Sequence, residues 1–190
     1  MAGNPTALYI HMSKKWNSEI AIPTDSSYII RCIEEVFGQS KSSGKPMITL
    51  KFEVVTPEEV DVAGEMITIA GVQTSPQYYV TQSVDENGNI DVEKSAEILK
   101  RLEKLYKAFG LPADSINPEN PTLGFKGKEV YAVLAADTQE RRKSPTAAQL
   151  AAGQKQGDVM INPLTKAPLI YNSIKVGEIF GLAPTAGGAF

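Results

Sequence analysis

Residues 27–55 read SYIIRCIEEVFGQSKSSGKPMITLKFEVV, and this stretch decides the fold class. Its second half alternates between apolar and polar residues, as a strand with one buried face does. The apolar positions are Ile48, Leu50, Phe52 and Val54. A polar turn with Gly44 and Pro46 precedes it, and the first half is rich in β-branched and aromatic residues, which favour strands. The stretch therefore predicts a β-hairpin with strands over residues 27–37 and 47–55.

Alternation along the first of these strands predicts two faces. One face holds Tyr28, Ile30, Cys32 and Val36, and the other holds Ile29, Arg31, Ile33 and Phe37.

Residues 91–109 carry the clearest helix pattern of the chain. Apolar residues recur there at spacings of three and four and form one stripe. They are Ile98, Leu99, Leu102, Leu105, Tyr106 and Phe109. Asp91 is the expected N-cap, and Gly110 followed by Pro112 ends the pattern. We expect this helix to pack on the sheet through Ile98, Leu102, Leu105 and Phe109.

Further strands are expected over residues 65–70, 78–83, 128–136 and 168–180, the last as one strand or as two short ones divided near Ser173, and a short one over 7–12. Residues 71–77 are expected to form a loop, and the polar stretch 137–157 a long loop or a frayed helix. The domain organisation that follows is an N-terminal arm over 1–22, one domain over 23–182 and a flexible tail over 183–190.

The composition of the chain limits the classes of protein to which it can belong. Of the 190 residues, 42% are hydrophobic and 22% charged, which is ordinary for a globular protein. No apolar run approaches 18 residues and no signal-peptide pattern opens the chain, so no membrane partner is expected. One cysteine, Cys32, suits a reducing compartment, and we expect a cytoplasmic protein, with the cytoplasm of an infected host left open.

The chain offers little for catalysis. Its one histidine, His11, lies in the expected arm, so a histidine-dependent nucleophile is not favoured. One cysteine and one histidine cannot build a Cys/His zinc site. We therefore expect a non-catalytic protein with no cofactor and no metal.

Charge is distributed unevenly along the chain. The net charge is −3, but residues 52–93 hold nine acidic residues and no lysine or arginine. The remaining residues hold 13 acids and 19 bases, which can leave one face basic. The alternative is a soluble protein with charges scattered over its surface.

Basic residues gather in two regions that also hold tyrosines. The first hairpin carries Lys41, Lys45 and Lys51, and the region around the long loop carries Lys126, Lys128, Arg141, Arg142 and Lys143. The aromatic candidates are Tyr28, Tyr131 and Tyr171. Cations for phosphates and flat rings for bases are what a single-strand binder needs. The alternative is that the cations are merely solvated and the rings lie in the core, and for Tyr131 the two alternatives are nearly balanced.

Four stretches together resemble a known family. They are PTDSSYIIRCIEEVFGQSKSSGKPMITLKFEVV (23–55), ILKRLEKLYKAFGLP (98–112), LGFKGKEVYAVLAAD (123–137) and NSIKVGEIFGL (172–182). Their order resembles a family of phage-encoded OB-fold-like proteins of replication and recombination, described as single-stranded-DNA-binding or of unknown function. The resemblance covers roughly residues 22–182.

The resemblance implies a mainly β fold with one prominent α-helix. Its core is a five-stranded OB-like Greek-key barrel, with the helix between the third and fourth strands and an extended loop before the last strand. Such barrels bind oligonucleotides across one sheet face and the flanking loops. The implied partner is single-stranded DNA, with RNA left open, together with proteins of replication, recombination or transcription. No oligomeric state is predicted.

Two other functions compete with this one. The chain could be an accessory module that docks a polymerase through its acidic segment 52–93, or a virion structural protein. The salt dependence of binding distinguishes DNA binding from protein docking, because binding through phosphates weakens steeply as the salt concentration rises.

Overall fold

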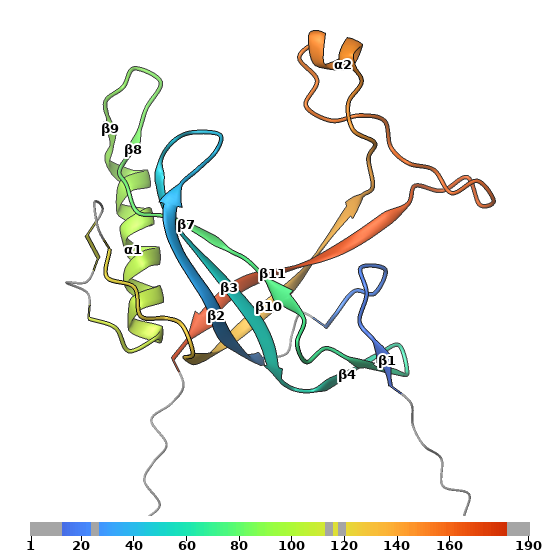
Figure 1. Ribbon diagram of the computed structural model, residues 1–190, viewed down its shortest axis with the longest axis horizontal. Coiled ribbons are helices and arrows are strands. Elements are labelled where there is room, and N and C mark those ends of the chain that lie inside the picture. The colour runs from blue at the N-terminus through green and yellow to red at the C-terminus, as the bar shows by residue number, and fades with distance from the viewer. Residues whose placement is uncertain (1–12, 24–26, 113–115, 118–120, 182–190) are drawn as a thin grey trace, which may run out of the picture.

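One curved six-stranded sheet organises the molecule (Figure 1). The computed structural model describes residues 13–23, 27–112, 116–117 and 121–181. In the sheet, the strands follow the order β11-β10-β2-β3-β6, and β7 also pairs with β3. Their bounds are β2 Ser27–Gln39, β3 Pro46–Thr56, β6 Gln73–Thr74, β7 Gln77–Tyr79, β10 Glu129–Glu140 and β11 Ile170–Phe180.

The predicted β-hairpin is confirmed. Strands β2 and β3 pair antiparallel, and the four apolar positions of β3 are all buried. The face of β2 changes partway along the strand, however. Its register with β3 shifts between Cys32 and Glu34, and beyond the shift Val36 is 47% exposed while Phe37 packs against the core. A bulge of this kind inserts one residue and inverts the alternation, so the single face expected for Cys32 and Val36 is wrong.

Helix α1, Val92–Ala108, confirms the second main prediction. Asp91 caps it by accepting a hydrogen bond from the backbone N–H of Lys94 at 3.0 Å. The buried residues of the helix and its cap are Leu102, Leu105, Tyr106 and Phe109. The Phe109 ring stacks on Phe52 of β3 with ring centres 5.9 Å apart, so the helix is packed on the core face of the sheet.

The two outer strands of the sheet order approach one another. Thr74 Oγ1 of β6 donates a hydrogen bond to the Ile174 carbonyl of β11 at 2.6 Å. Backbone pairing between these two strands is not found among the described residues, and the sheet is not closed into a barrel. The structure thus shows a mainly β protein with one long helix.

Smaller elements surround this sheet. A second sheet has the order β1-β5-β4, and β8 and β9 form a separate hairpin. The bounds are β1 Lys14–Lys15, β4 Glu59–Val62, β5 Glu65–Thr68, β8 Ser83–Val84 and β9 Ile90–Asp91. The strand expected over 65–70 is therefore shorter, the one expected over 78–83 is split between β7 and β8, and β4 was not predicted.

Residues 13–23 are docked on the domain. The backbone N–H of Trp16 donates to the Thr68 carbonyl at 3.0 Å, and Ile22 is buried in the core. Residues 13–22 of the expected N-terminal arm are thus packed against the domain. The expected strand over 7–12, His11 and the tail 183–190 lie outside the described residues.

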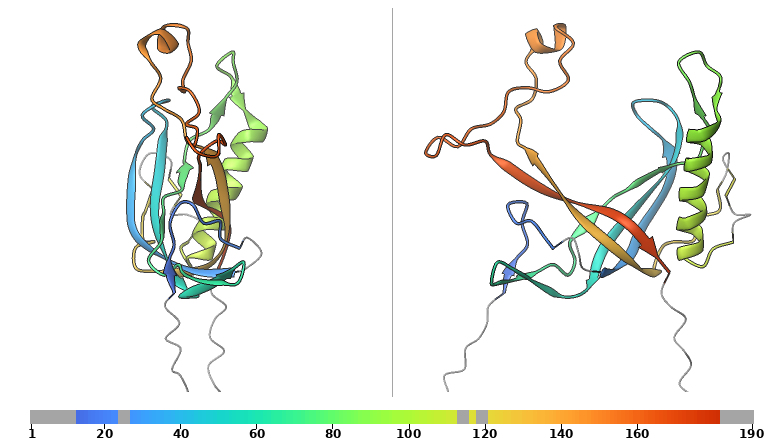
Figure 2. Two further views of the ribbon diagram at one scale, coloured as in Figure 1. Left: turned by 90° about the vertical axis from the view of Figure 1, so that its right-hand side faces the viewer. Right: turned by 180° about the vertical axis from the view of Figure 1, so that it is seen from behind.

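Strands β10 and β11 form a long hairpin whose connection is large. β10 continues to Glu140, past the predicted end, and β11 runs unbroken through Ser173. We name the connection, residues 141–169, the extension; it contains the short helix α2, Ala147–Ala151, and projects from one end of the sheet (Figures 1 and 2). Among the helices that the structure describes, none is long and apolar enough to cross a membrane.

Candidate nucleic-acid interface

A concavity of about 820 Å³ lies where the extension leaves the β10–β11 hairpin. It is lined by Ser18, Gln139, Glu140, Arg141, Arg142, Lys143, Pro145, Lys155, Gln156, Met160 and Tyr171. Four residues of the predicted site, Arg141, Arg142, Lys143 and Tyr171, meet here. Four cations and one carboxylate line the space, so its charge is positive although the chain as a whole is negative.

Backbone hydrogen bonds fix the cationic wall. The N–H of Arg141 donates to the Leu169 carbonyl at 2.7 Å, and the N–H of Lys143 donates to the Asp158 carbonyl at 2.9 Å. The two sides of the extension approach so closely that a Cβ at Gly157 would lie 2.5 Å from the Lys143 carbonyl oxygen. Glycine at this position therefore permits the pairing that brings Lys155 to the same concavity.

The four cations differ in what holds them. Arg142 forms an ion pair with Glu140 at 2.8 Å, and Arg141 donates to Ser18 Oγ at 3.3 Å. The ammonium groups of Lys143 and Lys155 have no side-chain partner among the described residues, and both side chains are exposed. These two lysines are the cations most available to an incoming phosphate.

Tyr171 supplies the flat surface of the concavity. It lies directly opposite Gln139 in the β10–β11 register, and its hydroxyl donates to Gln139 Oε1 at 2.7 Å. This bond orients the ring, which is only partly buried. A fixed ring beside several cations can stack a base while its phosphates are neutralised.

The loop between β2 and β3 lies at the same end of the molecule as the extension, in both views of Figure 2. It carries Lys41 and Lys45. Lys45 lines a smaller crevice of about 270 Å³ with Tyr79, whose side chain is 38% exposed. Tyr79 is not among the aromatic residues predicted from the sequence. Adjacent residues of a strand point to opposite faces, so the pair Tyr78 and Tyr79 in β7 is the sequence signal that one of the two rings faces outward.

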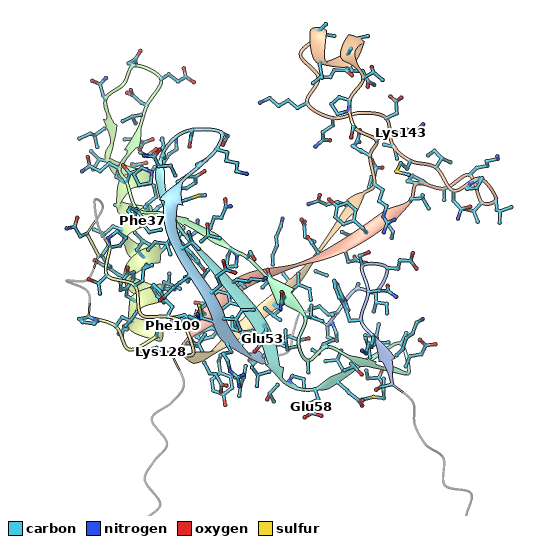
Figure 3. All side chains as sticks on the ribbon, in the orientation of Figure 1. Phe37, Glu53, Glu58, Phe109, Lys128 and Lys143 are labelled. Atoms are coloured by element: carbon cyan, nitrogen blue, oxygen red, sulfur yellow. The ribbon has the colours of Figure 1, made fainter. Side chains whose placement is uncertain are left out.

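Lys126 and Lys128 do not belong to this group. They precede β10 whereas Arg141 follows it, and a strand of 12 residues spans about 40 Å. Figure 3 shows Lys128 and Lys143 at opposite ends of the molecule. Lys128 Nζ also donates to the Phe109 carbonyl at 2.9 Å, where it satisfies the C-terminal end of α1. The expected proximity of these lysines to Arg141 is therefore wrong.

Tyr28 is a core residue. Its side chain is fully buried and its hydroxyl donates to the Pro23 carbonyl at 2.7 Å. The prediction that its ring stacks on a base is corrected, because a ring in the core offers no face to a ligand.

Tyr131 and Lys51 lie outside the concavity. Tyr131 is 39% exposed on the face of the sheet that turns away from the core, in register with Ile29 and Phe180. Lys51 lies opposite Glu34 in the β2–β3 register and is partly buried.

Residues that sequence reasoning missed complete the site. Lys155, Gln156, Met160 and Ser18 reach the concavity through the fold of the extension and the docked N-terminal segment. Lys155 stands alone in a polar stretch, so no local pattern marks it.

The described residues offer neither a metal site nor an activated thiol. Within the described ranges, no cluster of histidine, cysteine and carboxylate side chains could hold a metal ion. Burial raises the pKa of the Cys32 thiol to about 11, so the thiolate is scarce at neutral pH.

Comparison with known proteins found no relative of this chain at the level of sequence or structure, since no protein-family model, curated protein or solved structure matches it.

Proposed function

We propose that this protein is a non-catalytic single-stranded-DNA-binding protein that neutralises phosphates and stacks bases. The observation that carries the proposal is the gathering of Arg141, Arg142, Lys143 and Lys155 around Tyr171 in one concavity. A role in phage DNA replication or recombination rests on the family resemblance and belongs to the same proposal.

The negative net charge does not oppose this function, because Glu140 is the one acid among the described residues that line the concavity. Glu59, Asp61 and Glu65 belong to the β4–β5 hairpin, and Figure 3 places the neighbouring Glu58 far from Lys143. A locally positive surface attracts nucleic acid over distances of about 10 Å at moderate salt. The local charge, more than the total, therefore governs binding.

The fold supports the same proposal. Closing the sheet into a barrel requires only that β11 pair with β6, and Thr74 already bonds to Ile174 across this gap. We therefore propose an open OB-like barrel. In OB folds, the loop of the first hairpin and the loop before the last strand flank the ligand. Here these are the β2–β3 loop and the extension, which lie at the same end.

The test is oligo-dT binding by the double variant Lys143→Gln/Lys155→Gln at two or more salt concentrations. Each lost phosphate contact lowers the salt slope of single-strand binding by about 0.7, so we expect a loss of about 1.4. The matched control is Lys100→Gln/Lys107→Gln, which removes the same charge from exposed positions of α1. The control should keep the wild-type slope.

Equal slopes for the two double variants contradict the assignment of the concavity. Wild-type binding that does not change with salt contradicts DNA binding through phosphates, and the accessory docking module then becomes the better explanation.

Tyr171 and Tyr131 give a second prediction. We expect Tyr171→Ala to weaken oligo-dT binding by about 1–3 kcal/mol, because a stacked base is worth that much. Tyr131→Ala is expected to weaken it less, because Tyr131 does not line the concavity. Affinity and melting temperature are measured for both variants. A melting temperature that falls while the remaining folded protein binds normally would make Tyr171 a structural residue.

A further inference from the structure

Glu140 is the last residue of β10 and the one acid among the described residues that line the concavity. Its Oε2 accepts a hydrogen bond from a guanidinium nitrogen of Arg142 at 2.8 Å. Residues two apart on an extended chain point to the same side, so the local backbone builds this pair. A carboxylate thus stands inside the surface that is proposed to receive phosphates.

The ion pair between Arg142 and Glu140 can separate without a large loss of stability. The side chains of Arg142 and Glu140 are 40% and 44% exposed, and ion pairs at such exposure add little to stability. The second bond of Arg142, to the Gly157 carbonyl, is long at 3.5 Å. Arg142 can therefore exchange Glu140 for another anion at small cost to the fold.

A phosphate that enters the concavity meets two effects of Glu140. It meets repulsion from the carboxylate, and it finds Arg142 already engaged, whereas Lys143 and Lys155 are unpaired within the described part of the chain. We propose that Glu140 is an internal competitor of the bound strand, which holds Arg142 in the free protein and limits the affinity of the site. The proposal rests on the proposed single-strand-binding function, and its consequence is a site that releases its strand readily.

The experiment compares oligo-dT binding by the wild type and by Glu140→Gln. Removing the competing carboxylate is expected to raise the affinity about two- to five-fold at low salt, the range of an exposed ion pair. The salt slope is expected to steepen by about 0.7 as Arg142 gains a phosphate. The matched control is Glu178→Gln on β11, whose carboxylate pairs with Lys104 at 3.2 Å outside the concavity and should leave affinity unchanged.

A double-mutant cycle tests the route through Arg142. If Glu140 acts by holding this arginine, Glu140→Gln adds much less affinity in an Arg142→Gln background than in the wild type. A gain of the same size in both backgrounds overturns the competition.

The outcomes separate the two proposals. Salt-dependent binding by the wild type with no gain in Glu140→Gln overturns the role of Glu140 and leaves the proposed function standing. Absence of binding by both proteins overturns both proposals. A gain confined to Glu140→Gln and absent from Glu178→Gln supports both.

Discussion

Replacing Phe125 by alanine is expected to lower the free energy of unfolding by about 3–5 kcal/mol, the range for a buried phenylalanine. Phe125 is fully buried and packs edge-on against two aromatic rings, one in α1 and one in the residue that caps its C-terminal end. Its ring centre lies 5.0 Å from that of Tyr106 and 5.2 Å from that of Phe109. Phe125 lies in the segment that leads into β10, so its ring helps to fix α1 against the start of this strand, and its loss leaves a cavity there.

Urea denaturation measures the effect, with Leu99→Ala as the control. Leu99 belongs to the same helix but is exposed, so its replacement should change the free energy of unfolding by less than about 0.5 kcal/mol. Similar losses for the two variants would show that the aromatic cluster does not anchor the helix.

The elements that the sequence predicted are those encoded by local patterns. The alternation of residues 47–55 and the apolar stripe of residues 91–109 each specify one element, its buried face and its ends. Phe52 and Phe109 were expected in the core from these patterns alone, and the structure stacks them on each other.

Features that depend on long-range contacts could not be predicted this way. The bulge after Cys32 is a property of the pairing between β2 and β3, and no sequence pattern within β2 predicts it. The docking of residues 13–23 depends on Thr68 and on Asn172, whose N–H donates to the Ser18 carbonyl. These partners are distant in sequence.

The residues of the candidate site likewise divide into those that a local sequence pattern predicted and those that only the fold brings together. Arg141, Arg142 and Lys143 were found because they are contiguous in the chain. Lys128 was grouped with them because both flank the strand predicted over 128–136, but β10 continues to Glu140 and places them at its opposite ends. Lys155 was missed because only the folding of the extension brings it to Lys143.

Replacing Glu35 is the second change expected to lower the free energy of unfolding strongly. Glu35 follows the bulge of β2. Beyond the shifted register, its Oε2 accepts hydrogen bonds from three consecutive backbone N–H groups, those of Gly124, Phe125 and Lys126, at 3.0, 2.7 and 3.2 Å. Glu35→Ala leaves these donors without this acceptor, and each unsatisfied buried donor costs about 1–3 kcal/mol. Since water can reach the exposed Lys126, we expect a total loss of about 3–4 kcal/mol.

The neighbouring Glu34 provides the control, because its side chain is exposed and Glu34→Ala should cost less than about 0.5 kcal/mol. Glu35→Gln keeps one acceptor oxygen but loses the charge, so its cost should fall between those of the two alanine variants. Denaturation gives the three free energies, and amide hydrogen exchange at Gly124, Phe125 and Lys126 tests the cause. If these amides stay as protected in Glu35→Ala as in the wild type, Glu35 is not what holds the segment between α1 and β10, and Phe125 must be fixed by its aromatic contacts alone.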